Sequence, residues 1–190
     1  ILGCFSASPS KDRFPSAQIL EIAGTNILID CGEGTQIQLK RCGIKFNLIE
    51  HVFISHLHGD HFFGLPGLIS TFRLLGRTKP LNIYGPVGIK KAITLLLKLG
   101  NSWTNYDLIF KELEDSKPIK LLDKKKFSVQ TIPLNHRVYT NGFLFKEINN
   151  KSKLLIDVAL KFGVDKTQFS GIKIGKDGIG SDGKIIKNCD

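Results

Sequence analysis

Three of the chain's five histidines fall within Ser55–His61 (SHLHGDH), together with one aspartate. His56 and His58 are two residues apart and follow a short apolar segment, so at the end of a strand their side chains project to the same side. The glycine after them lets the backbone turn and brings Asp60 and His61 round at the start of a helix. The segment therefore predicts two pairs of side chains that converge on one small volume.

Imidazole and carboxylate groups are ligands for zinc, and also for manganese or iron. A single histidine after a strand is usually a packed or exposed side chain, and His51 is interpreted in this way. Three histidines beside an aspartate would make a poor core, because each buried imidazole needs its own hydrogen-bond partner. His136, at the end of a later strand, offers a third nitrogen to His56 and His58. We therefore expect a metal centre, with the candidate ligands His56, His58, Asp60, His61 and His136.

Strand and helix patterns alternate as far as about residue 148, which is typical of an α/β fold. The expected strands are Gln18–Ile22, Asn26–Asp30, His51–Ser55, Leu81–Tyr84, Tyr106–Leu113, Phe127–Leu134 and Gly142–Ile148. The expected helices are Glu33–Cys42, Phe62–Leu75 and Gly88–Leu99. The last forty residues are rich in lysine and glycine and have few apolar side chains with which to form a core.

The 190 residues are 42% hydrophobic, enough for one globular domain with a core. No apolar run approaches the length of a membrane-spanning helix, and no secretory leader is visible. We therefore expect a cytoplasmic protein with no membrane segment. Its four cysteines form no C-x-x-C pair, so they are interpreted as reduced structural thiols: Cys4, Cys31, Cys42 and Cys189.

The net charge of +10 is unevenly distributed along the chain. Residues 117–187 contain 15 lysines and arginines against 6 acidic residues, whereas the rest of the chain contains 12 against 11. A local surplus of this kind suggests a surface that faces an anionic partner such as RNA. It is equally compatible with a solvated lysine-rich face that binds nothing.

The pattern His56-x-His58-x-Asp60-His61 resembles the signature of metallo-β-lactamase-fold hydrolases, a fold that serves many chemistries. Its flanking segments resemble ribonuclease Z in order and spacing: Asp30–Gln36 (DCGEGTQ), Ser55–Gly67 (SHLHGDHFFGLPG), Leu81–Gly88 (LNIYGPVG), and His136–Val138 followed by Gly142 and Phe143. The resemblance covers nearly the whole chain. It implies an αββα sandwich whose N-terminal part is residues 1–148, followed by a basic flexible arm over 149–190.

The ribonuclease Z family consists of zinc-dependent endonucleases that remove the 3′ trailer from tRNA precursors. By resemblance, His56, His58 and His136 hold a first zinc ion, and Asp60 and His61 hold a second, with manganese as a possible substitute. Asp60 is also implied as the general base. A metal-activated hydroxide would attack the phosphodiester in line, leaving a tRNA 3′-hydroxyl and a 5′-phosphorylated trailer.

The resemblance also implies RNA contacts and an assembly. Pro9–Arg13 is similar to the family's loop at the tRNA 3′ end, which assigns Lys11 and Arg13 to substrate binding, although Phe14 replaces that loop's usual asparagine. Lys173 and Lys176 belong to the arm that grips the tRNA elbow. Bacterial members of the family are usually homodimers in which one subunit's arm serves the other's active site, so the resemblance implies a homodimer.

Two further family ligands, a bridging aspartate and a final histidine, are expected beyond the arm, and no histidine follows His136 here. We therefore expect the chain to be the N-terminal portion of the enzyme, with little activity alone. Two alternatives remain. One is a phosphodiesterase of the same fold acting on a small substrate, which would need neither a basic arm nor the Pro9–Arg13 loop. The other is a non-catalytic tRNA-binding or dimerisation module.

Overall fold

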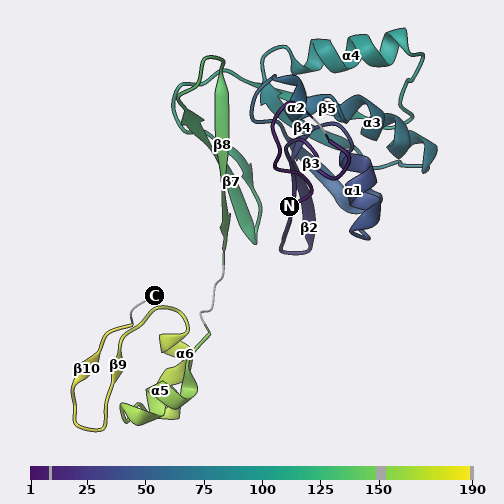
Figure 1. Cartoon of the computed structure of the whole chain (residues 1–190). Coiled ribbons are helices and arrows are strands. Elements are labelled where there is room, and N and C mark those ends of the chain that lie inside the picture. Colours follow the sequence, from purple (N-terminus) through teal and green to yellow (C-terminus); the bar gives the residue numbers. More distant parts are fainter. Residues whose placement is uncertain (9, 149–152, 189–190) are drawn as a thin grey trace. The chain divides into compact units, whose positions relative to one another are not determined.

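A computed structural model describes residues 1–8, 10–148 and 153–188, and the chain divides into two compact units (Figure 1). Unit 1 comprises Ile1–Glu147 and unit 2 comprises Ile148–Asp190. Pro9, Cys189 and the expected start of the arm at residue 149 lie outside the described residues. Among the described residues, no helix has both the length and the apolar character needed to cross a membrane.

The first sheet of unit 1 has five strands in the order β1-β2-β3-β4-β5. β1 and β2 form an antiparallel hairpin, whereas β2, β3, β4 and β5 run parallel. The strands are β1 (Ala17–Ile22), β2 (Thr25–Cys31), β3 (Ile49–Phe53), β4 (Leu81–Pro86) and β5 (Leu108–Leu113). The hairpin turn consists of Ala23 and Gly24, whose φ values are 49° and 76°. A two-residue turn needs positive φ at both positions to match the twist of the strands.

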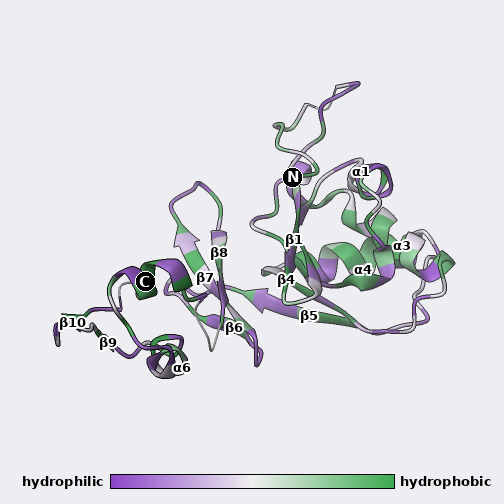
Figure 2. Ribbon diagram, turned by 90° about the horizontal axis from the view of Figure 1, so that it is seen from below, coloured by the Kyte–Doolittle hydropathy of each residue, from purple (hydrophilic) through white to green (hydrophobic). Residues whose placement is uncertain are grey.

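Helices occupy the crossovers between the parallel strands, as such connections require. They are α1 (Thr35–Arg41), the short η1 (Phe46–Leu48), α2 (Gly59–Phe62), α3 (Leu65–Leu74) and α4 (Ile89–Leu99). The strand period of two sends neighbouring side chains to opposite faces. In β3, Val52 joins the core cluster that includes helix residues such as Leu68 and Ile93, whereas Phe53 joins a second cluster. Figure 2 shows hydrophobic residues gathered in α3 and α4.

That second cluster lies between the five-stranded sheet and a smaller antiparallel sheet, ordered β6-β7-β8. Its strands are β6 (Lys120–Asp123), β7 (Phe127–Leu134) and β8 (Thr140–Glu147). Phe53 stacks on Tyr84 with ring centroids 4.4 Å apart, and its edge meets Phe143 from β8 at 5.0 Å. Unit 1 is therefore built as a helical layer, a mixed sheet and a second sheet.

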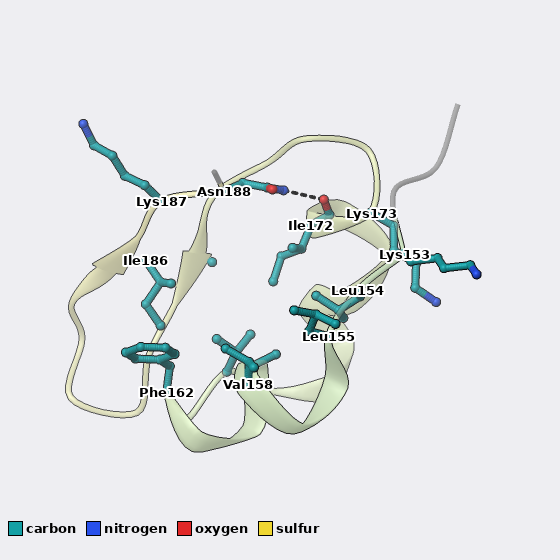
Figure 3. Close-up of a pocket in the computed structure, with 13 residues that line it drawn as sticks. Lys153, Leu154, Leu155, Val158, Phe162, Ile172, Lys173, Ile186, Lys187 and Asn188 are labelled. Atoms are coloured by element: carbon teal, nitrogen blue, oxygen red, sulfur yellow. Dashed lines mark hydrogen bonds between the residues drawn. The ribbon is translucent and has the colours of Figure 1, made fainter. Parts of the chain in front are cut away.

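Unit 2 has short elements and a partly open interior. They are α5 (Ile156–Lys161), η2 (Lys166–Gln168), α6 (Phe169–Ile172), β9 (Gly178–Ile179) and β10 (Ile185–Ile186). Val158, Phe162, Ile172 and Ile186 line a largely apolar cavity of about 550 Å³ between the helices and the hairpin (Figure 3). The amide of Asn188 donates to the Ile172 carbonyl and ties the end of the hairpin to α6.

All the strands and helices expected in residues 18–148 are present, but some boundaries differ. α1 starts at Thr35 rather than Glu33, because Gly34 has a left-handed φ of 77°. The helix expected over Phe62–Leu75, with a kink or late start at Pro66 and Gly67, does start late: α3 begins at Leu65 with Pro66 in its first turn, where proline's missing N–H costs nothing. β6 and the elements of unit 2 were not anticipated.

Arg77 lies in the loop after α3 and is only 5% exposed. It connects this loop to the sheet. Its guanidinium donates to the carbonyls of Lys79 (2.7 Å), Ile49 (2.9 Å) and Pro80 (2.7 Å). The same group lies over the rings of Phe72 and Tyr106, at 4.9 and 5.4 Å from their centroids. One cation therefore binds three carbonyl oxygens, among them that of the fully buried Ile49.

Replacing Arg77 with Met should lower the free energy of unfolding of unit 1 by about 3 kcal/mol, because hydrogen bonds to a charged group contribute about 1.5–3 kcal/mol each and are not additive. Urea titration followed by the fluorescence of Trp103, the only tryptophan and a residue of unit 1, measures this. Arg73→Met, an exposed change on α3, is the control. Equal midpoints for the two variants would contradict the role given to Arg77.

Candidate metal centre

The histidine-rich segment lies at the carboxyl-terminal edge of the five-stranded sheet. β2 and β3 are parallel neighbours, so their carboxyl ends meet at this edge. His56 and His58 follow β3 in an extended loop, and α2 carries Asp60 and His61. In open α/β sheets this edge is where ligands commonly bind.

His56, His58 and His136 form a three-histidine cluster, whose ligand nitrogens all lie within 4.8 Å of one another. His56 Nε2 is 3.0 Å from His58 Nδ1. The ring of His136 lies 5.2 Å from that of His56 and 5.4 Å from that of His58, centroid to centroid. His136 is exposed on the loop after β7, so the two sheets of unit 1 both contribute to the cluster.

The cluster fits a divalent transition metal. Zinc with imidazole ligands at 2.0–2.1 Å in tetrahedral geometry would place the nitrogens about 3.3 Å apart, close to the His56–His58 separation. The other ring nitrogen of His56, Nδ1, lies 3.0 Å from the hydroxyl of Ser55, which leaves Nε2 directed at the cluster. Burial and the neighbouring His61 and His58 lower the pKa of His56 to about 4. His56 is therefore neutral near pH 7, the form that binds a metal.

Asp60 and His61 form a second pair beside the cluster. Their closest side-chain atoms, Asp60 Oδ2 and His61 Nε2, are 3.5 Å apart. The opposite nitrogen of His61, Nδ1, is 2.7 Å from Asp30 Oδ2. Burial lowers the pKa of His61, but its hydrogen bond to Asp30 and the charges of Asp30 and Asp60 outweigh it, so the net shift is upward. The carboxylate of Asp30 thus holds Nδ1 and leaves Nε2 directed at Asp60.

Asp30 is a central residue that sequence reasoning did not select as a site residue. It is 4% exposed and accepts hydrogen bonds from the Ser55 backbone N–H (2.8 Å), the Ser55 hydroxyl (3.0 Å) and the Ser16 hydroxyl (3.1 Å). Its φ of 56° is left-handed, which aspartate tolerates better than most residues. One signal in the sequence could have identified Asp30: its carboxylate ends the strand that neighbours the strand before the histidines.

Glycines allow α2 to approach the end of β2 closely. A Cβ on Gly32 would lie 2.4 Å from the carbonyl oxygen of Asp60, and one on Gly64 would lie 2.1 Å from that of Gly32. The Gly64 N–H donates to the Cys31 carbonyl at 2.9 Å. Burial raises the pKa of Cys31 to about 12, so its thiol stays protonated and unsuited to metal binding.

The residues predicted to bind RNA lie outside this cluster. Lys11 and Arg13 are exposed in a turn closed by the Ser10 N–H and the Arg13 carbonyl at 3.2 Å. The Arg13 guanidinium lies 4.9 Å from the centroid of Phe5. Lys173 is partly buried after α6, and Lys176 is exposed, both in unit 2.

Comparisons with known proteins agree with this arrangement. A family model described as anti-Pycsar protein Apyc1 matches residues 1–170. Ribonuclease Z of Bacteroides thetaiotaomicron is 42% identical over 188 residues, which cover 99% of this chain and 60% of that protein. The crystal structure of human tRNase Z, short form, superposes with a TM-score of 0.72 and 32% identity, covering 90% of this chain and 80% of the human one.

A metallo-β-lactamase-fold protein of Bacillus subtilis superposes with a TM-score of 0.59 at 18% identity, covering 77% of this chain and 56% of that one, which bears on the fold alone. The chain spans about 60% of the length of the curated relatives it matches. The expected metallo-β-lactamase fold and the resemblance to ribonuclease Z are therefore confirmed. The chain belongs to the family of the Apyc1 model and, among metallo-β-lactamase-fold proteins, to the ribonuclease Z family.

Proposed function

We propose that the protein carrying this chain is a metal-dependent endoribonuclease that cleaves tRNA precursors 3′ of the discriminator base and removes the 3′ trailer. The observation that supports this most is the three-histidine cluster beside the Asp60–His61 pair, in a chain of the ribonuclease Z family. A cytoplasmic location, where tRNA precursors and reduced thiols are found, belongs to the same proposal.

The proposed roles follow from which atoms face one another. His56, His58 and His136 would hold one zinc ion, or manganese, and Asp60 and His61 would contribute to a second. Such ions, when bound, lower the pKa of a coordinated water and offset negative charge on the phosphodiester. Asp60 would accept a proton from the attacking water, and Asp30 would position His61 through their 2.7 Å contact. The remaining ligands are assigned to the part of the relatives' length that this chain does not span.

RNA binding is assigned to two surfaces. Unit 2, with the stretch 149–190 as its arm, would contact tRNA phosphates through Lys173 and Lys176, while Lys11 and Arg13 would approach the 3′ end. Such phosphate contacts position an RNA without reading its sequence. Residues 149–190 contain eight lysines against five acidic residues, and this excess of positive charge supports the assignment.

Cleavage of a 3′-extended tRNA precursor by the full-length gene product, supplied with zinc or manganese, tests the proposal. We expect a cut directly after the discriminator base and at least a hundredfold slower cleavage by His58→Ala, since a lost metal ligand should cost more than the 10–100-fold typical of outer-shell changes. Asn135→Ala, an exposed neighbour of the cluster, is the matched control.

The cleavage experiment also separates the alternatives. Folded, metal-loaded protein could leave the tRNA precursor intact but hydrolyse a small phosphodiester. In that case the tRNA-processing assignment is wrong, and the hypothesis of a phosphodiesterase acting on a small substrate is correct. If the protein binds tRNA without hydrolysing either substrate, the hypothesis of a non-catalytic tRNA-binding module is correct.

Asp30→Asn should weaken zinc binding by about 10–100-fold, the range for residues that orient metal ligands. Asparagine has nearly the same shape and tolerates the left-handed φ of position 30, so the change mainly removes the charge facing His61. Competition with a chromophoric chelator measures the affinity, with Ser16→Ala as a milder change at the same carboxylate. Equal zinc affinity for wild type and Asp30→Asn would show that Asp30 has no positioning role.

A homodimer is part of the proposal, with the outer face of α4 as its interface. Leu95, Leu96 and Leu99 are 50%, 48% and 72% exposed, and their spacing places them on one side of the helix. An exposed apolar stripe of this kind often marks a protein–protein contact.

Leu96→Glu with Leu99→Glu should convert the dimer to a monomer in sedimentation velocity, because each substitution places a charge in the apolar stripe. Lys98→Glu, an exposed change on the same helix, should leave the dimer intact. A wild-type protein that sediments as a monomer at every concentration would contradict this interface.

A further inference from the structure

Three consecutive lysines, Lys124–Lys126, form the turn between β6 and β7, and we call them the tri-lysine turn. The turn belongs to unit 1, so this part of the basic surplus does not lie in the proposed arm. The Lys124 N–H donates to the Phe127 carbonyl at 2.9 Å and closes the turn. Within the described part of the chain none of the three lysines forms an ion pair, and the adjacent Asp123 is already paired with Lys120 at 2.9 Å.

The tri-lysine turn borders a cavity of about 300 Å³. The rest of its wall is formed by Ala23, Thr25, Glu50, His51 and Phe127. Ala23 and Thr25 lie where β2 begins, whereas the metal-binding loop follows the opposite ends of β2 and β3. The carboxylate of Glu50, the one acidic group of the wall, is 3.1 Å from the ammonium of Lys79. The cavity is therefore separate from the metal centre and carries excess positive charge.

His51 is a buried polar group of this wall. His51 is only 4% exposed, and its Nδ1 atom is buried without a hydrogen-bond partner among the described residues. The ring packs near Tyr84 and Phe53, at 6.0 and 6.5 Å between centroids, and these rings offer it an apolar surface. Burial and the charge of Lys124 lower the pKa of His51 to about 4, so the ring is neutral and keeps one N–H donor.

His51 Nδ1 is too enclosed for a ligand to touch, so the ring nitrogen that the cavity can reach is Nε2, which also has no hydrogen-bond partner among the described residues. A neutral imidazole protonated at Nε2 offers its N–H to the cavity. We propose that this cavity binds a phosphate monoester, with the tri-lysine turn offsetting its charge and the His51 ring donating a hydrogen bond to a phosphate oxygen. A terminal phosphate can enter a small cavity to reach a side chain as buried as His51. A phosphodiester within a strand is flanked by a nucleoside on both sides and would stay at the rim.

The test is a titration of the metal-free full-length gene product with inorganic phosphate and with uridine 5′-monophosphate, at constant ionic strength. A chelator is present because phosphate also coordinates divalent metals. Long-range ¹H–¹⁵N spectra follow the ring nitrogens of His51 directly. We expect saturable shifts of these signals with both monoester-type ligands and no comparable shift with uridylyl-(3′→5′)-uridine, a diester whose phosphate has a nucleoside on both sides.

Two variants and a matched control complete the design. The triple change Lys124→Gln, Lys125→Gln and Lys126→Gln should weaken phosphate binding at least about tenfold, and His51→Phe should do so by a similar factor, as loss of a hydrogen bond to a charged group implies. For His51→Phe the affinity is measured by calorimetry. The triple change Lys90→Gln, Lys91→Gln and Lys98→Gln removes the same charge from exposed positions on α4 and should change the affinity less than twofold.

The proposal is wrong if the His51 signals do not respond to phosphate, if uridylyl-(3′→5′)-uridine produces equal shifts, or if both lysine triples weaken binding equally. None of these results depends on cleavage of tRNA. The cavity and the metal centre can therefore fail or succeed independently of each other.

Discussion

The arrangement of the candidate metal centre depends on the carboxylate of Asp30. It lies at the end of one parallel strand and receives hydrogen bonds from the loop that follows the neighbouring strand. A buried carboxylate without donors would be strongly disfavoured, so the positions of Ser55, Ser16 and His61 are coupled to it. The backbone at Asp30 adopts a left-handed φ that is sparsely populated, a local strain that the surrounding contacts maintain.

Close backbone packing completes the arrangement. The absence of side chains at Gly32 and Gly64 lets α2 rest against the end of β2, which sets where Asp60 and His61 begin their helix. The second sheet then adds His136 from the loop after β7. The Asn141 N–H donates to the Ser55 carbonyl at 3.0 Å and joins the start of β8 to the loop that carries His56 and His58. Small shifts in packing between the sheets would therefore alter the cluster.

Much of this site could be predicted from local pattern, and some of it could not. The spacing of His56 and His58 and the alternation of strands and helices are local features, so they were visible in the sequence. His136 was found because a third nitrogen was needed. Asp30 could not be chosen in this way, since its role depends on strand pairing and on a left-handed backbone. β6 and the hairpin of unit 2 were missed because lysine and glycine mask short strands that tertiary contacts stabilise.

The proposed ligands come from two sheets, and this division has a consequence for biogenesis. His136 follows His61 by 75 residues, and β7 must pair with β8 before the loop carrying His136 is anchored. During synthesis on the ribosome, an ion that needs all three imidazoles can be captured only after the hairpin has emerged and folded. Until then the nascent chain offers a partial set of ligands, which holds any metal weakly and releases it easily. Metal capture would thus follow the pairing of β7 with β8.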